Sequence, residues 1–196
     1  MKRIFDFIFS FLAIILLLPF FVIIALSIIF DSKGGIFYRQ IRVGKNNKDF
    51  KLIKFRTMFT NSDKKGLLTV GMRDSRITKV GYFLRRYKLD ELPQLFNIFI
   101  GDMSFVGPRP EVRKYVEMYD DEQLQVLAVR PGLTDYASLE YINENEILAK
   151  SENHEKTYID EIMPAKLKLN LKYIEEKSFW VDLKIIFKTA LKIIKL

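Results

Sequence analysis

One long apolar stretch dominates the N-terminal part of the chain. Residues 7–30 contain no charged side chain, and two serines are the only polar residues among them. An apolar run of about 18 residues or more is typical of a membrane helix. A secretory signal peptide has a shorter apolar core and ends in a small-residue cleavage site, which the sequence after Phe30 does not offer. We therefore expect residues 1–32 to stay on the protein as a membrane anchor.

Pro19 divides this apolar run near its middle. Proline lacks a backbone N–H and frees the carbonyl of Ile15, so the helix must kink or break there. Each half is roughly 17 Å long, too short to cross a hydrocarbon core of ~30 Å alone. Basic residues flank both ends of the run, which favours a re-entrant helix-break-helix that enters and leaves by the same face. A bent spanning helix is the alternative, since proline is common in membrane helices.

Beyond the anchor, short patterns predict small elements rather than one large sheet. Alternating apolar and polar positions predict a β-hairpin from residues 36–38 and 50–55, around a turn at 44–47. Apolar positions at helical spacing predict helices over 80–87, 90–100 (ending at Gly101), 111–129, 144–149 and 159–176 (with Pro164 as a start or kink). The hairpin and these helices together predict an α+β fold that is mostly α, in which residues 33–196 join the anchor without a linker.

The C-terminal stretch, residues 178–196, has the pattern of an amphipathic helix with one apolar and one basic side. A basic amphipathic helix with an aromatic residue at its start is suited to the plane of a membrane interface. The alternative is a surface helix that packs on the core of the protein. The apolar stripe consists of Trp180, Leu183, Phe187, Ala190, Leu191 and Ile194, and the basic side of Lys184, Lys188, Lys192 and Lys195.

Composition narrows the chemistry that such a fold could carry. The chain of 196 residues has no cysteine, which excludes disulfides, thiolate metal sites and a cysteine nucleophile. Its single histidine, His154, excludes a histidine-rich metal site and disfavours a serine–histidine triad. Any catalysis must therefore use carboxylates, lysines, arginines or tyrosines.

Positive charge gathers directly after the anchor. The net formal charge is +8, but residues 31–90 hold 16 Lys and Arg against five Asp and Glu, whereas residues 91–170 hold eight against 15. A basic segment beside a membrane helix is suited to anionic lipid headgroups or to a phosphorylated substrate. We expect no binding to nucleic acid, because the sequence carries no helix-turn-helix, zinc-finger or RNP motif.

The adjacent carboxylates of Asp90 and Glu91 are the first candidates for chemistry. Two acids at the start of a helix, with Pro93 just inside it, commonly act as capping and dipole residues. Here basic residues surround them, with Arg85 before the pair and Arg109 after it. Magnesium-dependent phosphoryl transfer also requires carboxylates among arginines, because metal and guanidinium neutralise the phosphates while a carboxylate binds metal or attacks. From these residues alone both interpretations stand.

Five motifs, which occur in this order along the chain, make a resemblance specific. Together they resemble the bacterial sugar transferases called monotopic phosphoglycosyl transferases, which are undecaprenyl-phosphate sugar phosphotransferases. The resemblance implies that residues 33–196 are a catalytic sugar-transferase domain, with interfacial amphipathic helices around an active site on the cytosolic face. The motifs are KFRTM at residues 54–58, LDELPQLFN at 89–97, GDMSFVGPRP at 101–110, RPGLT at 130–134 and DLKI at 182–185.

The resemblance implies a reaction at the cytoplasmic face of the bacterial inner membrane. A sugar 1-phosphate would pass from a UDP-sugar donor to polyprenyl phosphate with release of UMP, the first membrane step of surface polysaccharide or glycoconjugate synthesis. Asp90 would be the nucleophile that forms a covalent phosphosugar intermediate. Glu91, together with Asp90, would bind Mg²⁺, or Mn²⁺ in its place. Arg85 and Arg109 would bind phosphate.

Three further basic residues, Lys54, Arg56 and Arg130, are second-rank candidates for phosphate binding. Contact with lipid headgroups, or a place on the surface, is the alternative for each of them. A homodimer is compatible with the sequence. Two other functions also account for part of it: a non-catalytic, basic, membrane-anchored interaction protein, and a hydrolase of UDP-sugars or lipid phosphates.

Departures from the family pattern limit what the resemblance carries. The family commonly has Ser-Pro at the helix break, whereas this chain has Leu18 before Pro19. After RPGLT the family often continues with Gly and Ala-Gln, whereas this chain has Asp135 and then an acidic stretch at 140–155. We expect that region to shape the sugar pocket, so the identity of the sugar does not follow from the resemblance.

Overall fold

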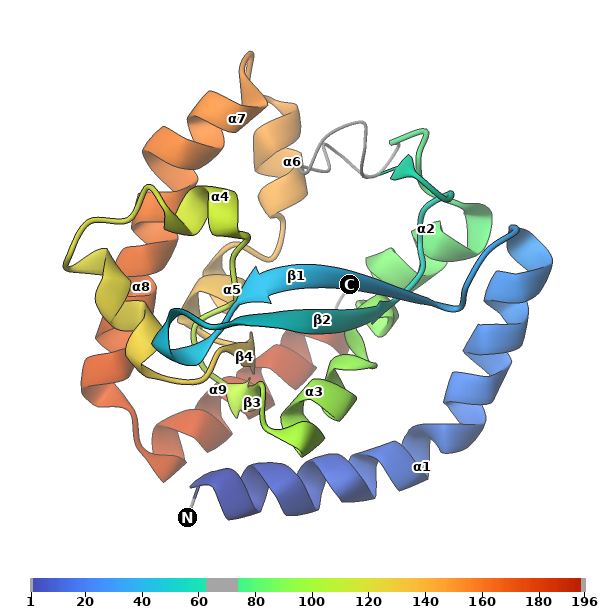
Figure 1. Ribbon diagram of the computed structural model, residues 1–196, viewed down its shortest axis with the longest axis horizontal. Coiled ribbons are helices and arrows are strands. Elements are labelled where there is room, and N and C mark those ends of the chain that lie inside the picture. Colours follow the sequence, from blue (N-terminus) through green and yellow to red (C-terminus); the bar gives the residue numbers. More distant parts are fainter. Residues whose placement is uncertain (1, 63–73, 195–196) are drawn as a thin grey trace.

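The computed structural model describes residues 2–62 and 74–194, and it is an α+β fold dominated by helices (Figure 1). The elements of the N-terminal half are α1 (Lys2–Asp31), β1 (Phe37–Val43), the 3₁₀ turn η1 (Lys45–Asn47), β2 (Asp49–Phe55), α2 (Lys79–Arg86), the 3₁₀ turn η3 (Leu89–Glu91) and α3 (Gln94–Ile100). Those of the C-terminal half are β3 (Ser104–Val106), α4 (Arg113–Val116), the 3₁₀ helix η4 (Gln123–Ala128), β4 (Gly132–Thr134), α5 (Tyr136–Glu140), α6 (Glu144–Ala149), α7 (His154–Thr157), the π-turn η5 (Tyr158–Ile162), α8 (Met163–Glu176) and α9 (Phe179–Ile194).

Helix α1 is the long apolar helix that the sequence predicts, and its length and composition would allow it to cross a membrane. It runs without interruption through Pro19, so the predicted break is a bend, which Figure 1 shows near the middle of the helix. A proline removes one backbone hydrogen bond, and the remaining bonds carry the helix past it. Most of the apolar side chains of α1 are exposed. Its passage into and out of one membrane leaflet stays a prediction.

Both ends of α1 are attached to the rest of the protein. At the N-terminal end, the Arg3 guanidinium donates to the carbonyl oxygens of Ile98, at 2.5 Å, and Phe99, at 2.6 Å, in the last turn of α3. At the C-terminal end, the Asp31 carboxylate accepts a hydrogen bond of 3.0 Å from the backbone N–H of Val80 in α2. The two ends therefore contact neighbouring elements of one body rather than lying apart from it.

The predicted β-hairpin is confirmed. Strands β1 and β2 pair antiparallel from Phe37 opposite Phe55 to Val43 opposite Asp49. The turn between them uses Asn46 and Asn47, whose φ angles are 57° and 60°. Asparagine tolerates this left-handed conformation better than most residues, which explains why the chain reverses there.

The main hydrophobic core lies between α1, the hairpin and α3. Phe21 and Ile28 of α1 are buried against Leu52 and Phe55 of β2 and Ile98 of α3. A second core joins α4 and η4 to α8, and a third joins β3, α8 and α9. The short strands β3 and β4, which no sequence pattern predicts, pair in parallel and connect these parts.

The predicted helix over residues 111–129 is wrong. The segment forms the single turn α4 and the separate 3₁₀ helix η4. Asp120 and Gln123 interrupt it: the Asp120 carboxylate accepts from the N–H of Gln123 at 2.8 Å, and the Gln123 side chain accepts from the N–H of Asp120 at 3.2 Å. This reciprocal arrangement has the pattern of a capping box and lies directly before η4, which begins at Gln123, so the chain starts a new helical segment there.

The other predicted helices are present with adjusted ends. The stretch 90–100 begins as the turn η3 and continues as α3, which ends at Gly101 with a φ of 100°. The stretch 159–176 begins with the π-turn η5 before α8, and Pro164 lies at the start of α8. Residues 195 and 196 of the predicted C-terminal helix lie outside the described residues.

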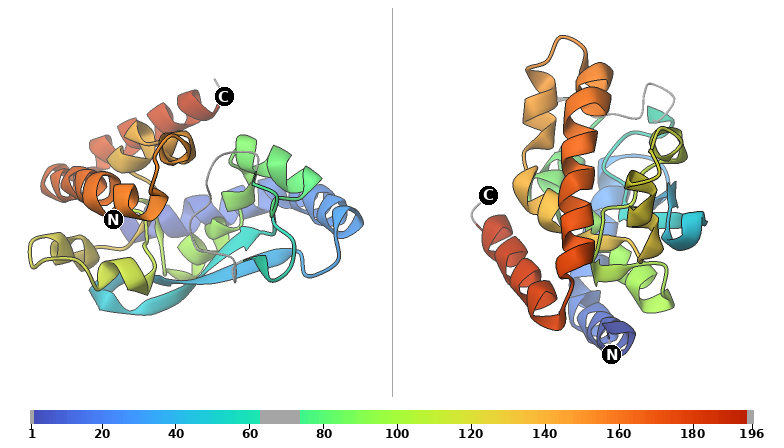
Figure 2. Two further views of the ribbon diagram at one scale, coloured as in Figure 1. Left: turned by 90° about the horizontal axis from the view of Figure 1, so that it is seen from above. Right: turned by 90° about the vertical axis from the view of Figure 1, so that its left-hand side faces the viewer.

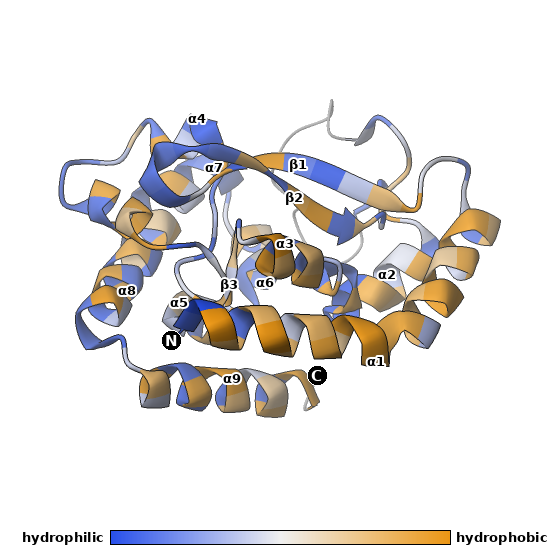
Figure 3. Cartoon of the chain, turned by 60° about the horizontal axis from the view of Figure 1, so that its bottom comes forward, coloured by the Kyte–Doolittle hydropathy of each residue, from blue (hydrophilic) through white to orange (hydrophobic). Residues whose placement is uncertain are grey.

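Helix α9 turns back after α8, so that it lies beside α1 (Figures 2 and 3). An ion pair between Lys2 and Asp182 connects the two helices. Ile185 of α9 is fully buried, whereas Trp180 and Ile194 in its apolar stripe are 77% and 81% exposed. The stripe therefore faces away from the core, and insertion of α9 into a membrane interface stays a prediction.

Candidate active site

A cleft of about 1040 Å³ contains most of the residues that the sequence singles out. Strands β1 and β2, helix α2, the turn η3 and helices α5, α6 and α8 contribute to its walls. Of the predicted site residues, Lys54, Arg56, Arg85, Asp90, Glu91 and Arg109 line the cleft, whereas Arg130 does not.

The two carboxylates reach the cleft because the chain turns sharply between α2 and α3. Lys88 adopts a left-handed conformation with a φ of 56°, and the turn η3 follows it. Asp90 in this turn is 8% exposed. Within the part of the chain that the structure describes, no side chain or backbone N–H donates a hydrogen bond to the Asp90 carboxylate. Its oxygens are therefore free to meet a ligand in the cleft.

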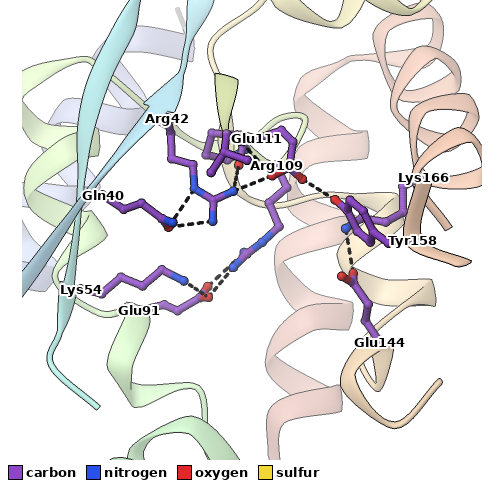
Figure 4. A network of polar contacts seen from close by, with 11 residues as sticks. Gln40, Arg42, Lys54, Glu91, Arg109, Glu111, Glu144, Tyr158 and Lys166 are labelled. Atoms are coloured by element: carbon purple, nitrogen blue, oxygen red, sulfur yellow. Dashed lines mark hydrogen bonds and ion pairs between the residues drawn. The ribbon is translucent and has the colours of Figure 1, made fainter. Parts of the chain in front are cut away.

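The Glu91 carboxylate, in contrast, is held by two cations (Figure 4). Lys54 donates to its Oε1 at 2.9 Å. The Arg109 guanidinium binds both oxygens, through Nη2 to Oε1 and through Nη1 to Oε2 at 3.1 Å. Burial acts to raise the pKa of Glu91, but the charges of Arg109 and Lys54 outweigh it and hold the pKa well below its usual range.

The pKa values of Asp90 and Lys54 are shifted in the direction that burial favours. Burial, followed by the charge of Glu91, raises the pKa of Asp90, although Lys54 and Arg85 act against the shift. Burial lowers the pKa of Lys54, although Glu91 acts against it. Perturbed groups that gather in one cleft are typical of functional sites.

Asn97 positions the strand that carries Lys54. The side chain of Asn97 is fully buried, and its Oδ1 accepts from the N–H of Ile53 at 3.0 Å. Its Nδ2 donates to the carbonyl oxygen of Lys51 at 2.8 Å. The amide thus satisfies the open edge of β2 as a neighbouring strand would, and it fixes β2 against α3. Sequence reasoning missed this role, because the pairing joins residues far apart in the chain.

A second polar network lies at the far side of Arg109 (Figure 4). The Glu111 carboxylate accepts from Arg42 at 2.8 Å and from the Tyr158 hydroxyl. Arg42 also donates to the carbonyl oxygen of Pro110 at 3.1 Å, so it holds the backbone on the C-terminal side of Arg109. An ion pair of 2.7 Å between Lys166 and Glu144 lines the same wall. No pattern in the sequence indicates this network beyond the charges of its residues.

Arg56 lines the cleft, but its guanidinium donates its hydrogen bonds to the end of α1 and the residues just after it. The side chain is 7% exposed, and its guanidinium donates to the carbonyl oxygens of Gly35 at 2.6 Å, Ser32 at 2.8 Å and Lys33 at 2.9 Å. These oxygens lie at and just beyond the C-terminal end of α1, where a cation also complements the helix dipole. Arg130 likewise donates from Nε to the carbonyl oxygen of Gly101 at 2.8 Å. Phosphate binding by either arginine stays a prediction.

Asp90 and Glu91 are the residues available to hold a divalent cation. Among the described residues, no group of three or more histidines and carboxylates could form an all-protein metal cage. Magnesium rarely needs one, since one or two carboxylates, water and substrate phosphate oxygens complete its six ligands. The Asp90 carboxylate has no hydrogen-bond partner among residues 2–62 and 74–194, and Glu91 keeps one of about four acceptor positions after its contacts with Lys54 and Arg109. The pair fits a cation that is bound chiefly through the substrate.

Comparison with known proteins finds one family and relatives of one kind. A sequence profile of the family described as "Bacterial sugar transferase" matches residues 1–196. The chain is 36% identical over 191 residues to the UDP-N-acetylgalactosamine-undecaprenyl-phosphate N-acetylgalactosaminephosphotransferase of Aeromonas hydrophila, covering 96% of this chain and 42% of that protein. It is 38% identical over 195 residues to the UDP-glucose:undecaprenyl-phosphate glucose-1-phosphate transferase of Klebsiella pneumoniae, covering 97% and 39%.

A shorter relative matches over most of its own length. The exopolysaccharide production protein ExoY of Sinorhizobium fredii is 36% identical over 203 residues, covering 96% of this chain and 83% of that protein. The chain spans about two fifths of the length of the Aeromonas and Klebsiella relatives.

Proposed function

This chain belongs to the bacterial sugar transferase family, and on that premise we propose that it transfers a sugar 1-phosphate from a UDP-sugar to polyprenyl (undecaprenyl) phosphate. UMP is the second product, and the sugar-diphosphate lipid starts a surface polysaccharide or glycoconjugate. The names of the Aeromonas and Klebsiella relatives support the acceptor and the class of donor. The observation that carries the proposal is the buried Asp90 carboxylate, which accepts no hydrogen bond from the described residues and lies in a basic cleft beside Glu91.

In the first step an Asp90 oxygen attacks the phosphorus that bears the sugar. A bond forms between that oxygen and phosphorus, and the bond from phosphorus to the oxygen that bridges the two phosphates breaks. UMP leaves with that oxygen and its electron pair. The sugar phosphate then stays on Asp90 as an acyl phosphate.

In the second step a phosphate oxygen of the lipid attacks the same phosphorus. The bond from phosphorus to Asp90 breaks, the carboxylate is restored, and the lipid leaves with the sugar phosphate attached. Two sequential steps allow one cleft to receive first the donor and then the acceptor, so the cleft never has to hold both.

Basic side chains around Asp90 supply most of the charge that this reaction needs. The Arg109 guanidinium can bind a phosphate with two parallel hydrogen bonds, and Arg85 and Lys54 add further positive charge. Glu91 aligns Arg109 and Lys54 before the substrate arrives. Magnesium, held by Asp90 and Glu91, would neutralise the negative charge that accumulates on the phosphates and the leaving group.

The exposed apolar surfaces suit an enzyme at the cytoplasmic face of the bacterial inner membrane. The acceptor is insoluble in water, and its phosphate lies at the interface between lipid and water. Helix α1 and the apolar stripe of α9 are both exposed, and they lie on one side of the molecule (Figure 3). With both in the membrane, the cleft can receive a lipid phosphate that has not left the bilayer.

Release of UMP tests the proposal against its two alternatives. The protein in lipid nanodiscs is given UDP-glucose or UDP-N-acetylgalactosamine with magnesium, with and without polyprenyl phosphate. We expect UMP in an amount up to one per protein without the acceptor, and continuous UMP release with it. Continuous release without acceptor would indicate a hydrolase. The absence of UMP release with a broad panel of UDP-sugars would leave a non-catalytic anchored protein.

A further inference from the structure

A buried carboxylate lies behind Arg109, and the proposed reaction does not use it. Asp135, which stands between β4 and α5, is fully buried. Its Oδ2 accepts a hydrogen bond of 3.1 Å from the backbone N–H of Arg109, and its Oδ1 accepts one of 2.5 Å from the N–H of Ser138. Burial of a charge without such hydrogen-bond partners is strongly unfavourable in free energy. One side chain therefore connects two segments that are 26 residues apart.

Arg109 is thus held at both of its ends. Asp135 binds its backbone N–H, and Glu91 binds its guanidinium. The backbone on the C-terminal side of Arg109 is fixed as well, because Arg42 donates to the carbonyl oxygen of Pro110. The charge of Glu91 has the largest effect on the pKa of Arg109 and raises it, whereas burial acts to lower it. The charge of Asp135 is a further, smaller contribution that raises this pKa.

We propose that Asp135 is a positioning residue: it fixes the backbone of Arg109, so that the guanidinium meets the diphosphate of the donor in one orientation. The inference rests on the proposed function, because it assigns Arg109 to the phosphates of a UDP-sugar. A misplacement of about 1 Å is enough to weaken a two-point contact of this kind substantially. Asp135 itself touches neither substrate nor reacting atoms.

The competing explanation is that Asp135 only caps α5. Its Oδ1 contact with Ser138, three residues ahead, is the usual N-cap interaction, and serine makes that interaction almost as well as aspartate. Serine is too short to reach Arg109 as well. Asp135→Ser therefore keeps the cap and removes the contact with Arg109. Asp135→Asn keeps the size of the side chain but has only one acceptor oxygen for two N–H donors.

The control is a second N-cap outside the lining of the cleft. Asn153 caps α7 by accepting from the N–H of Lys156 at 3.0 Å, and it does not line the cleft. Asn153→Ala removes a cap of the same kind without touching Arg109. A thermal melt of each variant shows whether it is folded, so that only folded proteins enter the comparison.

The test is the dissociation constant of UDP, measured by calorimetry on the full chain in detergent. We expect Asp135→Ser and Asp135→Asn each to weaken UDP binding about tenfold, and Asn153→Ala to leave it unchanged. In an Arg109→Ala background the same Asp135 changes should have no further effect, because coupled residues are not additive. Unchanged UDP binding in a folded Asp135 variant, or an equal loss with and without Arg109, overturns the inference alone. A wild-type protein that does not bind UDP overturns the proposed function together with the inference.

Discussion

Asp90 and Glu91 are neighbours in the chain, yet their carboxyl groups have pKa shifts of opposite direction. Burial and the charge of Glu91 raise the pKa of Asp90, whereas Arg109 and Lys54 overcome the effect of burial and lower the pKa of Glu91. Among the described residues, the fold therefore pairs the Glu91 carboxylate directly with two cations, whereas the adjacent Asp90 carboxylate accepts no hydrogen bond. An unpaired carboxylate is suited to attack, and a paired one is suited to align its cations.

The first prediction is that Asp90→Asn abolishes turnover but stabilises the protein. A group whose pKa is raised by folding contributes stability at low pH and loses it as the pH rises through the raised value. In metal-free buffer at pH 8 the variant should melt about 2–4 °C above wild type, equivalent to about 1 kcal/mol. Turnover should fall on the order of 10³-fold or more.

Two results would contradict this prediction. Residual activity within tenfold of wild type would exclude Asp90 as the nucleophile. A melting temperature below that of wild type at pH 8 would show that the Asp90 charge is stabilised by a partner. The gain in melting temperature should shrink as the pH falls toward 4, where wild-type Asp90 also becomes neutral.

The second prediction is that the neighbouring change, Glu91→Gln, destabilises the protein. It removes the carboxylate that forms ion pairs with both Lys54 and Arg109, whose side chains are 19% and 33% exposed. Loss of one partner of a fully buried pair costs about 3–5 kcal/mol, so we expect a cost of up to about 3 kcal/mol here. Thermal melts at pH 7 should show the deficit directly. Metal dependence gives a second measurement, because a neutral amide is a poor ligand for magnesium and the variant should require a higher concentration of it. Wild-type activity in excess EDTA would contradict the proposed magnesium requirement.

The third prediction concerns the dependence of stability on pH at Glu111. Burial acts to raise the pKa of Glu111, but Arg42, Lys166 and the hydrogen bond from Tyr158 outweigh it, so the pKa lies below its usual value of 4.5. Folding lowers this pKa, so the contribution to stability is present above pH 4.5 and is lost as the pH falls through the lowered value.

Glu111→Gln should therefore lower the free energy of unfolding by about 3 kcal/mol at pH 7. The difference from wild type should narrow between pH 5 and pH 3. Glu155→Gln is the matched control, because Glu155 pairs with Lys114 at the surface, where both side chains are about half exposed. Such pairs contribute about 0–1 kcal/mol. If the loss of stability in Glu111→Gln does not change with pH, the loss comes from packing and not from the charge of Glu111.

The sequence predicts elements whose signal is local. The hairpin, the end of α3 at Gly101 and the apolar α1 all follow from short patterns and turn-forming residues. The same patterns failed over residues 111–129, where the side chains of Asp120 and Gln123 bind each other's backbone and start a separate helix.

Partners that are distant in the chain are the part of the site that the sequence could not supply. The motifs at 89–97 and 101–110 predict that Asp90, Glu91 and Arg109 belong to one site. In the structure all three line one cleft. Asn97 bound to the edge of β2 and Asp135 bound to Arg109 depend on how segments pack, so no spacing along the chain indicates either contact.

The fourth prediction separates two roles for Arg56. Its guanidinium is occupied by carbonyl oxygens at the end of α1, so Arg56→Lys should lower the melting temperature, because one ammonium cannot bind three separate carbonyl oxygens in that geometry. The Michaelis constant for the UDP-sugar should stay within twofold of wild type. Arg39→Lys, on an exposed position of β1, should change neither quantity. A large rise in the Michaelis constant of the Arg56 variant at an unchanged melting temperature would instead assign Arg56 to phosphate binding.

The last prediction is that both ends of α1 lie on the cytoplasmic side. Arg3 at one end binds carbonyl oxygens of α3, and Asp31 at the other binds the N–H of Val80 in α2. A straight helix of 30 residues would be about 45 Å long and would place its ends on opposite sides of a ~30 Å hydrocarbon core. A spanning α1 would therefore break one of these two sets of contacts, whereas a helix that bends and returns within one leaflet keeps both.

Because the chain has no cysteine, single cysteines report the position of each segment without background. One cysteine is added ahead of Met1, and one replaces the exposed Lys33 just after α1. A third replaces the exposed Lys45 in the hairpin turn and reports the position of the residues that follow α1. An impermeant thiol reagent should label none of the three in intact cells and all three after lysis. Labelling of the N-terminal cysteine alone in intact cells would establish a spanning helix, and the contacts of Arg3 with α3 could not then exist in the membrane. Pro19→Leu in the same background should leave all three cysteines protected, because the contacts at both ends of α1, and not the proline alone, hold those ends on one side.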